Sequence, residues 1–121
     1  MIWFLVLQLA RPYHVETIAS MPTCRHTHVA VTGRVILVRQ EADGDWHLRL
    51  SDNGKRFIVA EIIPTLQPIK GHELDAFAIA LPKLNECVEV RGIRRVDTES
   101  GHGWTEIHPV EFLKVIPCKL P

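Results

Sequence analysis

The sequence predicts an all-β domain built as one closed barrel of five strands. Five runs of alternating apolar and polar residues indicate the strands. A stretch with apolar residues at helical spacing separates the third run from the fourth and predicts one short helix. Glycine stands in the middle of the first and fourth runs, where a strand interior excludes it unless the strand bends or is closely approached. A long bent strand suits a small closed barrel, because that strand serves both halves of the sheet.

The first strand is expected to begin at His28. Apolar residues alternate from Val29 and occupy both faces toward Val38, with Gly33 between them. The turn 41–45 follows and contains Asp-Gly, a strong hairpin signal.

The second and third strands are expected over 46–51 and 55–62, joined by a turn at 52–54. In each strand one set of alternate residues faces the interior and the other faces outward. The two sets of the second strand are Trp46, Leu48 and Leu50 against His47, Arg49 and Ser51. Those of the third strand are Phe57, Val59 and Glu61 against Ile58, Ala60 and Ile62.

The second half of the chain begins with a short helix expected over 72–81. The fourth strand is expected over 87–96, and a fifth strand lies within 102–109, followed by an apolar extension at 112–116. This order matches the oligonucleotide- and oligosaccharide-binding (OB) fold, a five-stranded Greek-key barrel with one helix between strands three and four. A five-stranded sandwich or an SH3-like barrel is the structural alternative. We divide the chain into an N-terminal arm and linking segment, 1–26, and a barrel domain, 27–121.

The composition limits the possible partners. The chain has 121 residues, and its 14 Lys and Arg balance its 14 Asp and Glu, so binding to nucleic acid or to an anionic membrane would require a local patch. We expect no membrane association and a cytoplasmic location. Cys24, Cys87 and Cys118 form no Cys-x-x-Cys pair, and their odd number favours thiols over one disulfide and a spare.

The N-terminal stretch Met1–Leu9 is strongly apolar. It is too short to span a bilayer, and it lacks the basic residues that open a signal peptide. We expect an ordered arm that covers a sheet edge or pairs with a second copy, which would make a homodimer.

The fifth strand carries the main candidates for metal binding. Trp104, Glu106 and His108 share one of its faces. Imidazole and carboxylate are usual ligands for zinc and other first-row divalent ions, so Glu106 and His108 are candidate ligands. An exposed polar face without an ion is the alternative interpretation. The residues that would complete a site are Asp45, His47, Glu61 and His102.

The region 35–64 resembles the micrococcal-nuclease family in its Asp43-Gly44-Asp45 turn, followed by Arg56 and Glu61. The resemblance implies that Asp45 and Glu61 hold a divalent ion and that Arg56 neutralises charge on a phosphodiester. The positions that depart from that family's pattern are Trp46, Ile62 and Pro64.

Binding of single-stranded nucleic acid is a further possibility for an OB barrel, which stacks bases on aromatic side chains of strands two and three. Trp46 and Phe57 are the aromatic candidates, although their alternation is also typical of the barrel interior. The basic candidates are Arg34, Arg49, Lys55 and Arg56, with a second cluster at Arg91, Arg94 and Arg95.

Most of the chain also resembles a group of small, uncharacterised bacterial OB-like proteins. The segments that carry this resemblance are 29–39, 43–47, 59–62, 88–92 and 102–110. It implies a common site but no reaction. The residues of that site are Asp45, His47, Glu61, His102, Glu106 and His108.

The sequence therefore predicts a small non-catalytic binding module for an unknown small ligand or oligonucleotide. The alternatives are a divalent-metal-dependent phosphodiester hydrolase and a single-stranded nucleic-acid-binding protein. The predicted ligand-binding residues are Asp45, His47, Arg49, Arg56, Glu61, His102, Trp104, Glu106 and His108. The cofactor hypothesis is a divalent metal ion held by Asp45, Glu61, Glu106 and His108.

Overall fold

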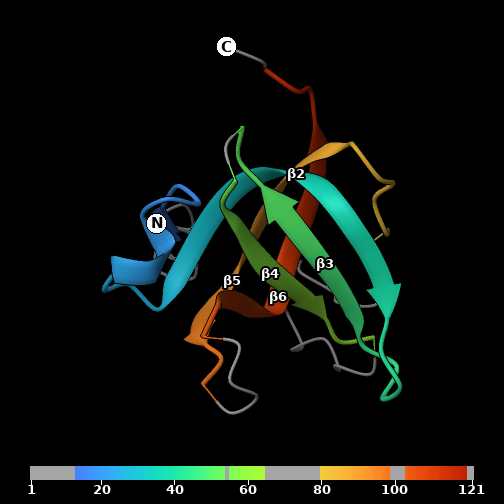
Figure 1. Cartoon of the computed structure of the whole chain (residues 1–121), viewed down its shortest axis with the longest axis horizontal. Coiled ribbons are helices and arrows are strands. Elements are labelled where there is room, and N and C mark those ends of the chain that lie inside the picture. The colour runs from blue at the N-terminus through green and yellow to red at the C-terminus, as the bar shows by residue number, and fades with distance from the viewer. Residues whose placement is uncertain (1–12, 54, 65–79, 99–102, 120–121) are drawn as a thin grey trace, which may run out of the picture.

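The computed structural model describes residues 13–53, 55–64, 80–98 and 103–119, which form a β-barrel (Figure 1). A short 3-10 helix, η1, precedes the barrel at Met21–Thr23. The strands are β1 (His14–Val15), β2 (His28–Gln40), β3 (Trp46–Ser51), β4 (Phe57–Ile62), β5 (Cys87–Val96) and β6 (Thr105–Ile116).

The strands form one sheet that closes on itself. Their order is β1-β2-β3-β4-β6-β5, and a further pairing of β2 with β5 closes the barrel. β4 and β6 run parallel, and the other pairs within the barrel are antiparallel. The predicted all-β, five-stranded OB-type barrel is confirmed, with β1 added as a short parallel strand beside β2.

β2 is the long bent strand that the sequence predicts. Its residues 28–34 pair with β5 and its residues 34–40 pair with β3. Gly33 lies where the partner changes, and a Cβ there would lie 2.9 Å from Ile18 Cδ1 and 3.1 Å from Leu50 Cβ. Glycine therefore lets the core pack tightly beneath the bend.

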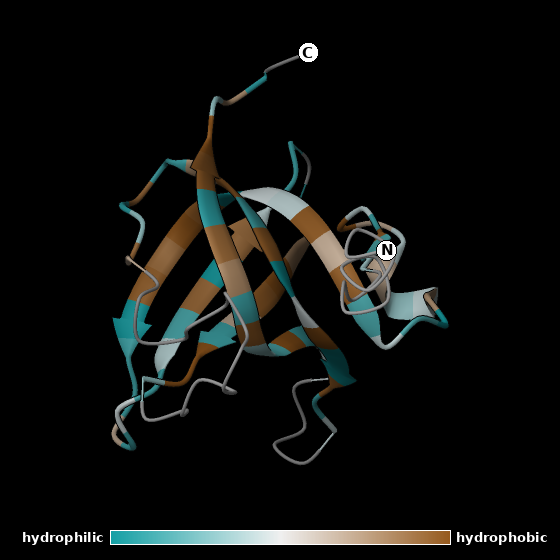
Figure 2. Cartoon of the chain, turned by 180° about the vertical axis from the view of Figure 1, so that it is seen from behind, coloured by the Kyte–Doolittle hydropathy of each residue, from teal (hydrophilic) through white to brown (hydrophobic). Residues whose placement is uncertain are grey.

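The core lies inside the barrel and follows the predicted alternation, which Figure 2 shows as bands of hydrophobic and hydrophilic residues along the strands. The segment before β2 also contributes to it, since Ile18 and Met21 are fully or almost fully buried. The Arg94 side chain holds this segment, because its Nε donates to Met21 O at 2.7 Å and its Nη2 donates to Pro22 O at 2.8 Å. Residues 13–26 thus pack onto the barrel although their sequence has no regular period.

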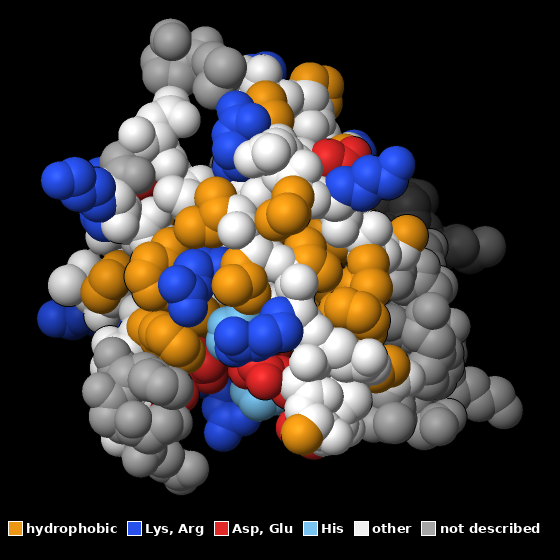
Figure 3. Space-filling view, turned by 45° about the vertical axis from the view of Figure 1, so that its right-hand side comes forward, with side chains coloured by type: hydrophobic (Ala, Val, Ile, Leu, Met, Phe, Trp, Pro, Cys, Tyr) orange, Lys and Arg blue, Asp and Glu red, His pale blue; other side chains and the backbone are white. Residues whose placement is uncertain are grey.

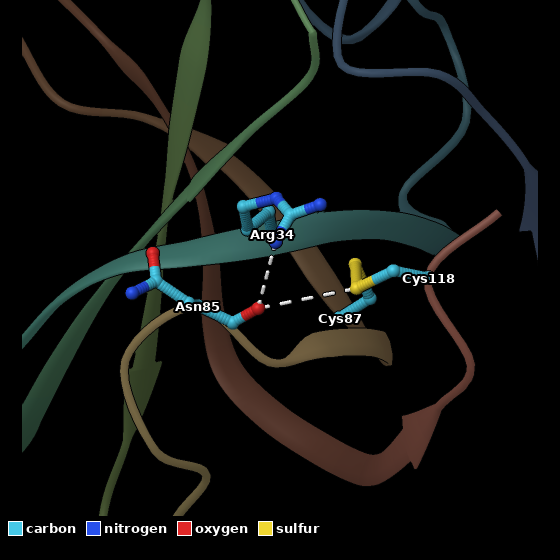
Figure 4. The surroundings of a disulfide bond; sticks show 4 residues. All are labelled: Arg34, Asn85, Cys87 and Cys118. Atoms are coloured by element: carbon cyan, nitrogen blue, oxygen red, sulfur yellow. Dashed lines mark hydrogen bonds between the residues drawn. A yellow bond between two sulfur atoms is a disulfide. The ribbon is translucent and has the colours of Figure 1, made fainter. Parts of the chain in front are cut away.

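The prediction of three thiols is wrong for two of the cysteines. Cys87 and Cys118 form a disulfide between the start of β5 and the residues after β6 (Figure 4). Cys24 is free. The two bonded cysteines are 31 residues apart, and the β5–β6 register brings them together by placing Cys87 opposite Ile116.

Two predicted elements lie outside the described residues, the arm at Met1–Leu9 and most of the helix at 72–81. The homodimer that the arm would form stays a prediction. No helix in the described ranges is long and apolar enough to cross a membrane. The cytoplasmic location also stays a prediction, and a disulfide is more typical of oxidising compartments.

Candidate functional site on the outer face of β3, β4 and β6

The outer face of β3 and β4 carries the side chains that alternate with the core residues. Leu48, Leu50 and Ile58 point inward and belong to the core. The residues between them therefore point outward. Their cross-strand pairs are His47 with Glu61, Arg49 with Val59 and Ser51 with Phe57.

β6 adds the third strand of this face. Its parallel register places Glu106 beside Val59, and Ile107 enters the core beside Ala60. The neighbouring outward residues of β6, two positions before and after Glu106, are Trp104 and His108. Trp104, Glu106 and His108 therefore share a face, as predicted, and this face continues the outer face of β3 and β4.

A polar cluster occupies one end of this face, and it consists of Glu41, Asp45, His47, Glu61, Glu106 and His108. His47 Nδ1 lies 3.0 Å from Glu41 Oε1 and 3.6 Å from Glu61 Oε1. His108 Nε2 lies 3.5 Å from Glu61 Oε2, and its Nδ1 lies 3.9 Å from Glu106 Oε1. Glu61 thus contacts both imidazoles.

Asp45 joins the polar cluster from the β2–β3 turn. Its backbone N–H donates to Asp43 Oδ1 at 2.9 Å, and Gly44 has a positive φ of 96°, so the turn has the geometry that Asp-Gly predicts. One potential ligand atom each from Asp45, Glu61 and His108 lies within 4.8 Å of the other two. Three of the four predicted metal ligands therefore converge.

Charge is concentrated in the polar cluster. The pKa of Glu61 is raised to about 7, first by burial and then by the carboxylates of Glu106, Asp45, Asp43 and Glu41. Burial and the neighbouring Asp43 also raise the pKa of Asp45. Protons are therefore held more tightly here than on ordinary carboxylates.

His47 is the most deeply placed histidine of the polar cluster, with 4% of its surface exposed. Burial lowers its pKa, so the ring is mainly neutral at pH 7. Its Nε2 and the Nε of Arg49 are buried and have no hydrogen-bond partner among the described residues. Unpaired buried nitrogens cost about 1–3 kcal/mol each, and a ligand or water that bonded to these two would remove that cost.

An aromatic cluster of Arg49, Phe57 and Trp104 lies next to the polar cluster. The Arg49 guanidinium carbon lies 4.4 Å from the centre of the Phe57 ring and 5.5 Å from that of Trp104. The two rings meet edge to face, with centres 5.9 Å apart. Trp104 also meets the His47 ring edge to face, and its Nε1 donates to Glu106 Oε2 at 3.0 Å. Figure 3 shows one face of the molecule on which hydrophobic and basic side chains lie beside a group of acidic and histidine side chains.

The structure places the remaining predicted residues elsewhere. Arg56 forms an ion pair with Asp52 across the β3–β4 turn, Nε to Oδ2 3.0 Å. It precedes β4, whereas Glu61 lies near the other end of that strand. At about 3.3 Å per residue, the Cα atoms of the two residues are roughly 16 Å apart. The nuclease-like arrangement of Arg56 with Asp45 and Glu61 is therefore absent. His102 lies outside the described residues.

The two aromatic candidates of β3 and β4 point to opposite sides. Trp46 packs against the core, because it shares a face with Leu48. Phe57 points outward into the aromatic cluster. The interior position that the alternation favours is therefore correct for Trp46 and wrong for Phe57, and Trp46 is not available as a stacking surface.

Glu41 was missed by the sequence reasoning, which assigned it to the turn. Its backbone N–H donates to Asp45 O at 2.8 Å, and this continues the register in which Gln40 pairs with Trp46. A hairpin centred on Asp43 would have indicated this pairing.

Comparison with solved structures finds barrels of the same type. The telomere capping protein Ten1 from Saccharomyces pombe aligns with a TM-score of 0.57 and 15% identity, over 86% of this chain and 81% of Ten1. A putative aspartyl-tRNA synthetase from Leishmania major Friedlin aligns with a TM-score of 0.58 and 15% identity, over 92% of this chain and 22% of the synthetase. The chain folds as an OB-type barrel.

A third similar structure is OBody AM1L10, solved bound to hen egg-white lysozyme. It aligns with a TM-score of 0.58 and 18% identity, over 88% of this chain and 97% of the OBody. At these identities the likeness shows the fold and not the ligand. No family model and no curated protein matches the chain in sequence, so the nuclease-like and bacterial resemblances gain no support.

Proposed function

We propose that this protein is a non-catalytic binding module that binds single-stranded nucleic acid on the outer face of β3, β4 and β6. The aromatic cluster is the observation that carries this proposal. It places the half-buried Phe57 ring and a guanidinium on the second and third barrel strands, with which OB domains bind oligonucleotides, and the half-buried Trp104 ring beside them.

The aromatic cluster suits bases because every base has a flat face that stacks on aromatic rings and on guanidinium planes. Each stacked base contributes about 1–3 kcal/mol in proteins of this kind. Trp104 is held in place through its hydrogen bond to Glu106, and Phe57 is held beside it by the edge-to-face contact. Rings fixed before binding lose little conformational freedom when a base arrives.

The polar cluster suits base edges and not phosphates. Its carboxylates repel a phosphate backbone, whereas a carboxylate accepts a hydrogen bond from an exposed amino group such as that of cytosine. Lys55 and Arg56 lie at the opposite end of the face, beside the β3–β4 turn, and both are exposed. We therefore place base edges toward Glu61 and the backbone toward Arg56.

Two of the similar structures are named for nucleic-acid systems, a telomere capping protein and a tRNA synthetase. Those names are consistent with the proposal. The lysozyme-bound OBody is an OB-type barrel that binds a protein. The experiment must therefore distinguish nucleic-acid binding from protein binding.

The test is fluorescence anisotropy with labelled single-stranded DNA and RNA of about 12 nucleotides, within the usual site size of an OB domain. We expect saturable binding at low salt in the presence of a chelator. Phe57→Ala and Trp104→Ala should each weaken it about tenfold or more, since each removes one stacking surface.

Phe112→Ala is the matched control. Phe112 also lies under an arginine, with the Arg91 guanidinium carbon 4.4 Å from its ring centre, but it belongs to the β5–β6 side together with Tyr13. Its removal should leave the affinity unchanged. Absence of binding, or an equal loss in Phe57→Ala and Phe112→Ala, contradicts the proposal.

A second candidate function is binding of a divalent cation by Asp45, Glu61 and His108. The convergence of their ligand atoms within 4.8 Å favours it. Glu106 is a less direct ligand than the sequence suggests, because Trp104 Nε1 already donates to its Oε2. An ion here would offset the charge of the polar cluster and would admit phosphate, which the hydrolase alternative requires.

Calorimetric titration with Mn²⁺, which prefers carboxylate to thiolate ligands, tests this candidate. Binding should be lost in the double variant Asp45→Asn/Glu61→Gln and retained in Asp52→Asn, which changes a carboxylate at the other end of β3. If an ion binds, incubation with labelled oligonucleotide shows whether hydrolysis accompanies it. Equal binding by the two variants contradicts the assignment.

A further inference from the structure

A second group of ligand-type side chains lies before β2, on the part of the chain drawn in blue in Figure 1. It consists of His14 and Glu16, at and just after β1, and of Cys24 and His26, between η1 and β2. In both pairs the two residues are separated by one position. Glu16 N–H donates to Ala30 O at 2.9 Å, which extends the pairing with β2, so His14 and Glu16 face the same side.

Three of these side chains, those of His14, Glu16 and His26, converge. His14 Nε2 lies 3.2 Å from Glu16 Oε2, and the His14 and His26 rings stack with centres 3.5 Å apart and planes 16° apart. One ligand atom each from His14, Glu16 and His26 lies within 4.8 Å of the other two.

Cys24 is a free thiol beside this group. The His26 backbone N–H donates to Cys24 Sγ at 3.2 Å, so the thiol lies next to His26.

We propose that His14, Glu16, Cys24 and His26 form a zinc site. Two imidazoles, a thiolate and a carboxylate are a donor set that zinc takes in tetrahedral geometry, and the sulfur favours zinc over magnesium or calcium. Bonds of about 2.1 Å place ligand atoms about 3.4 Å apart in a tetrahedron. Exposed His14 and His26 can close the remaining distance by rotating their side chains.

The site would join the two ends of the segment that packs against the barrel. β1 has two residues and pairs with β2 at Val29 and Ala30. Between the two ligand pairs the chain passes through η1 and places Ile18 and Met21 in the core. A metal bonded to both pairs would therefore fix this segment on the barrel, because it binds the folded arrangement and not the unfolded chain.

The proposal is independent of the outer face of β3, β4 and β6. Cobalt(II) is the probe, titrated anaerobically into the full chain and then displaced with zinc. A tetrahedral site with a thiolate gives intense visible bands and a sulfur-to-cobalt charge-transfer band. We expect one equivalent with this signature, and zinc should abolish it.

Three variants locate the site. Cys24→Ser should remove the charge-transfer band, and His14→Asn/His26→Asn should weaken cobalt binding about tenfold or more, because it removes two ligands. His28→Asn, a histidine at the start of β2 beside the Tyr13 ring, is the matched control and should behave as the parent chain. Circular dichroism of each variant checks that the barrel is retained.

The double variant Asp45→Asn/Glu61→Gln separates this site from the outer-face candidate and should leave the charge-transfer band intact. A parent chain without that band, or an unchanged cobalt affinity in His14→Asn/His26→Asn, overturns the proposal. Loss of the band in Asp45→Asn/Glu61→Gln overturns it as well.

Discussion

At the scale of single residues, Glu61 is the outer-face residue whose pKa its surroundings change most clearly. Its side chain is 17% exposed, it contacts both imidazoles of the polar cluster, and four other carboxylates act on it. Because its pKa in the folded chain is about 7, against an ordinary value of 4.5, the folded state binds the proton more tightly than the unfolded state.

The first prediction follows from this difference. Between pH 4.5 and pH 7 the folded state binds more protons at Glu61 than the unfolded state, so the free energy of unfolding falls as the pH rises through this window. The loss attributable to Glu61 in the metal-free protein is roughly 3 kcal/mol at pH 8 relative to pH 4, from about 1.4 kcal/mol per pKa unit.

Urea unfolding with a chelator at several pH values measures the effect. Glu61→Gln should be more stable than the parent chain at pH 8 and lose that advantage near pH 4, because glutamine has no charge to bury. Glu89→Gln, on β5 and paired with Arg91 at 3.1 Å, serves as the control. A constant difference between Glu61→Gln and the parent at all pH values would count against the assignment.

At the same scale, hydrophobic alternation grouped the residues that share a face, but it did not decide which way Phe57 points. Trp46 shares its face with Leu48 and Leu50, whereas Phe57 shares its face with Val59 and Glu61, so the pattern leaves the direction of Phe57 open. The cross-strand pairing decides, since it places Trp46 opposite the buried Ile62 and Phe57 opposite Ser51.

At the scale of elements, β5 and β6 form a long antiparallel pair whose far end is locked by the disulfide. Cys87 begins β5, and Cys118 follows β6 by two residues. Asn85, just before β5, accepts a hydrogen bond from Arg34 Nη1 of β2 at 3.0 Å (Figure 4). The covalent bond therefore lies where β2, β5 and β6 meet.

The second prediction concerns this bond. Closing a loop with a sequence separation of 31 residues restricts the unfolded chain and stabilises the fold by about 3–4 kcal/mol in the loop-entropy description. Cys87→Ser/Cys118→Ser should lower the free energy of unfolding by this amount in denaturant titrations, with the barrel retained in the absence of denaturant.

Cys24→Ser in zinc-free buffer is the control for that experiment, because Cys24 is not disulfide-bonded. It should change the stability by much less. If both variants lose the same stability, the disulfide does not contribute in the way described.

The glycine positions show how far local sequence determines an element. Gly92 was identified as a place of bending or close approach, and in the structure a Cβ there would clash with Pro109 O and Ile107 Cγ2 of β6. The sequence indicated the close approach. The identity of the approaching strand depends on the β5–β6 register, which shifts on both sides of Gly92.

At the scale of the whole molecule, charge balance limits how nucleic acid could bind. The 14 basic side chains equal the 14 acidic ones in number, and the polar cluster is acidic. Affinity on the outer face must therefore come mainly from stacking on the aromatic cluster, with few phosphate contacts.

The third prediction is a shallow dependence of oligonucleotide affinity on salt. With one or two phosphates contacted, the slope of log K against log salt concentration should be about −1, at roughly −0.7 per contact on single strands. Anisotropy titrations between low and moderate salt measure it. A slope steeper than about −4 would mean that phosphate contacts dominate, contrary to the arrangement proposed for bases and backbone.

The sequence by itself determined the barrel, because the alternation of apolar and polar residues is fixed by the pleat of each strand and the glycines mark the bends. It also identified Asp45, Glu61, Glu106 and His108 as candidate metal ligands. The tertiary structure decided which of them meet. Contacts such as Glu61 with His108, Phe57 with Trp104 and His14 with His26 join residues distant in the chain, and their closeness depends on strand register and on how the segment before β2 packs.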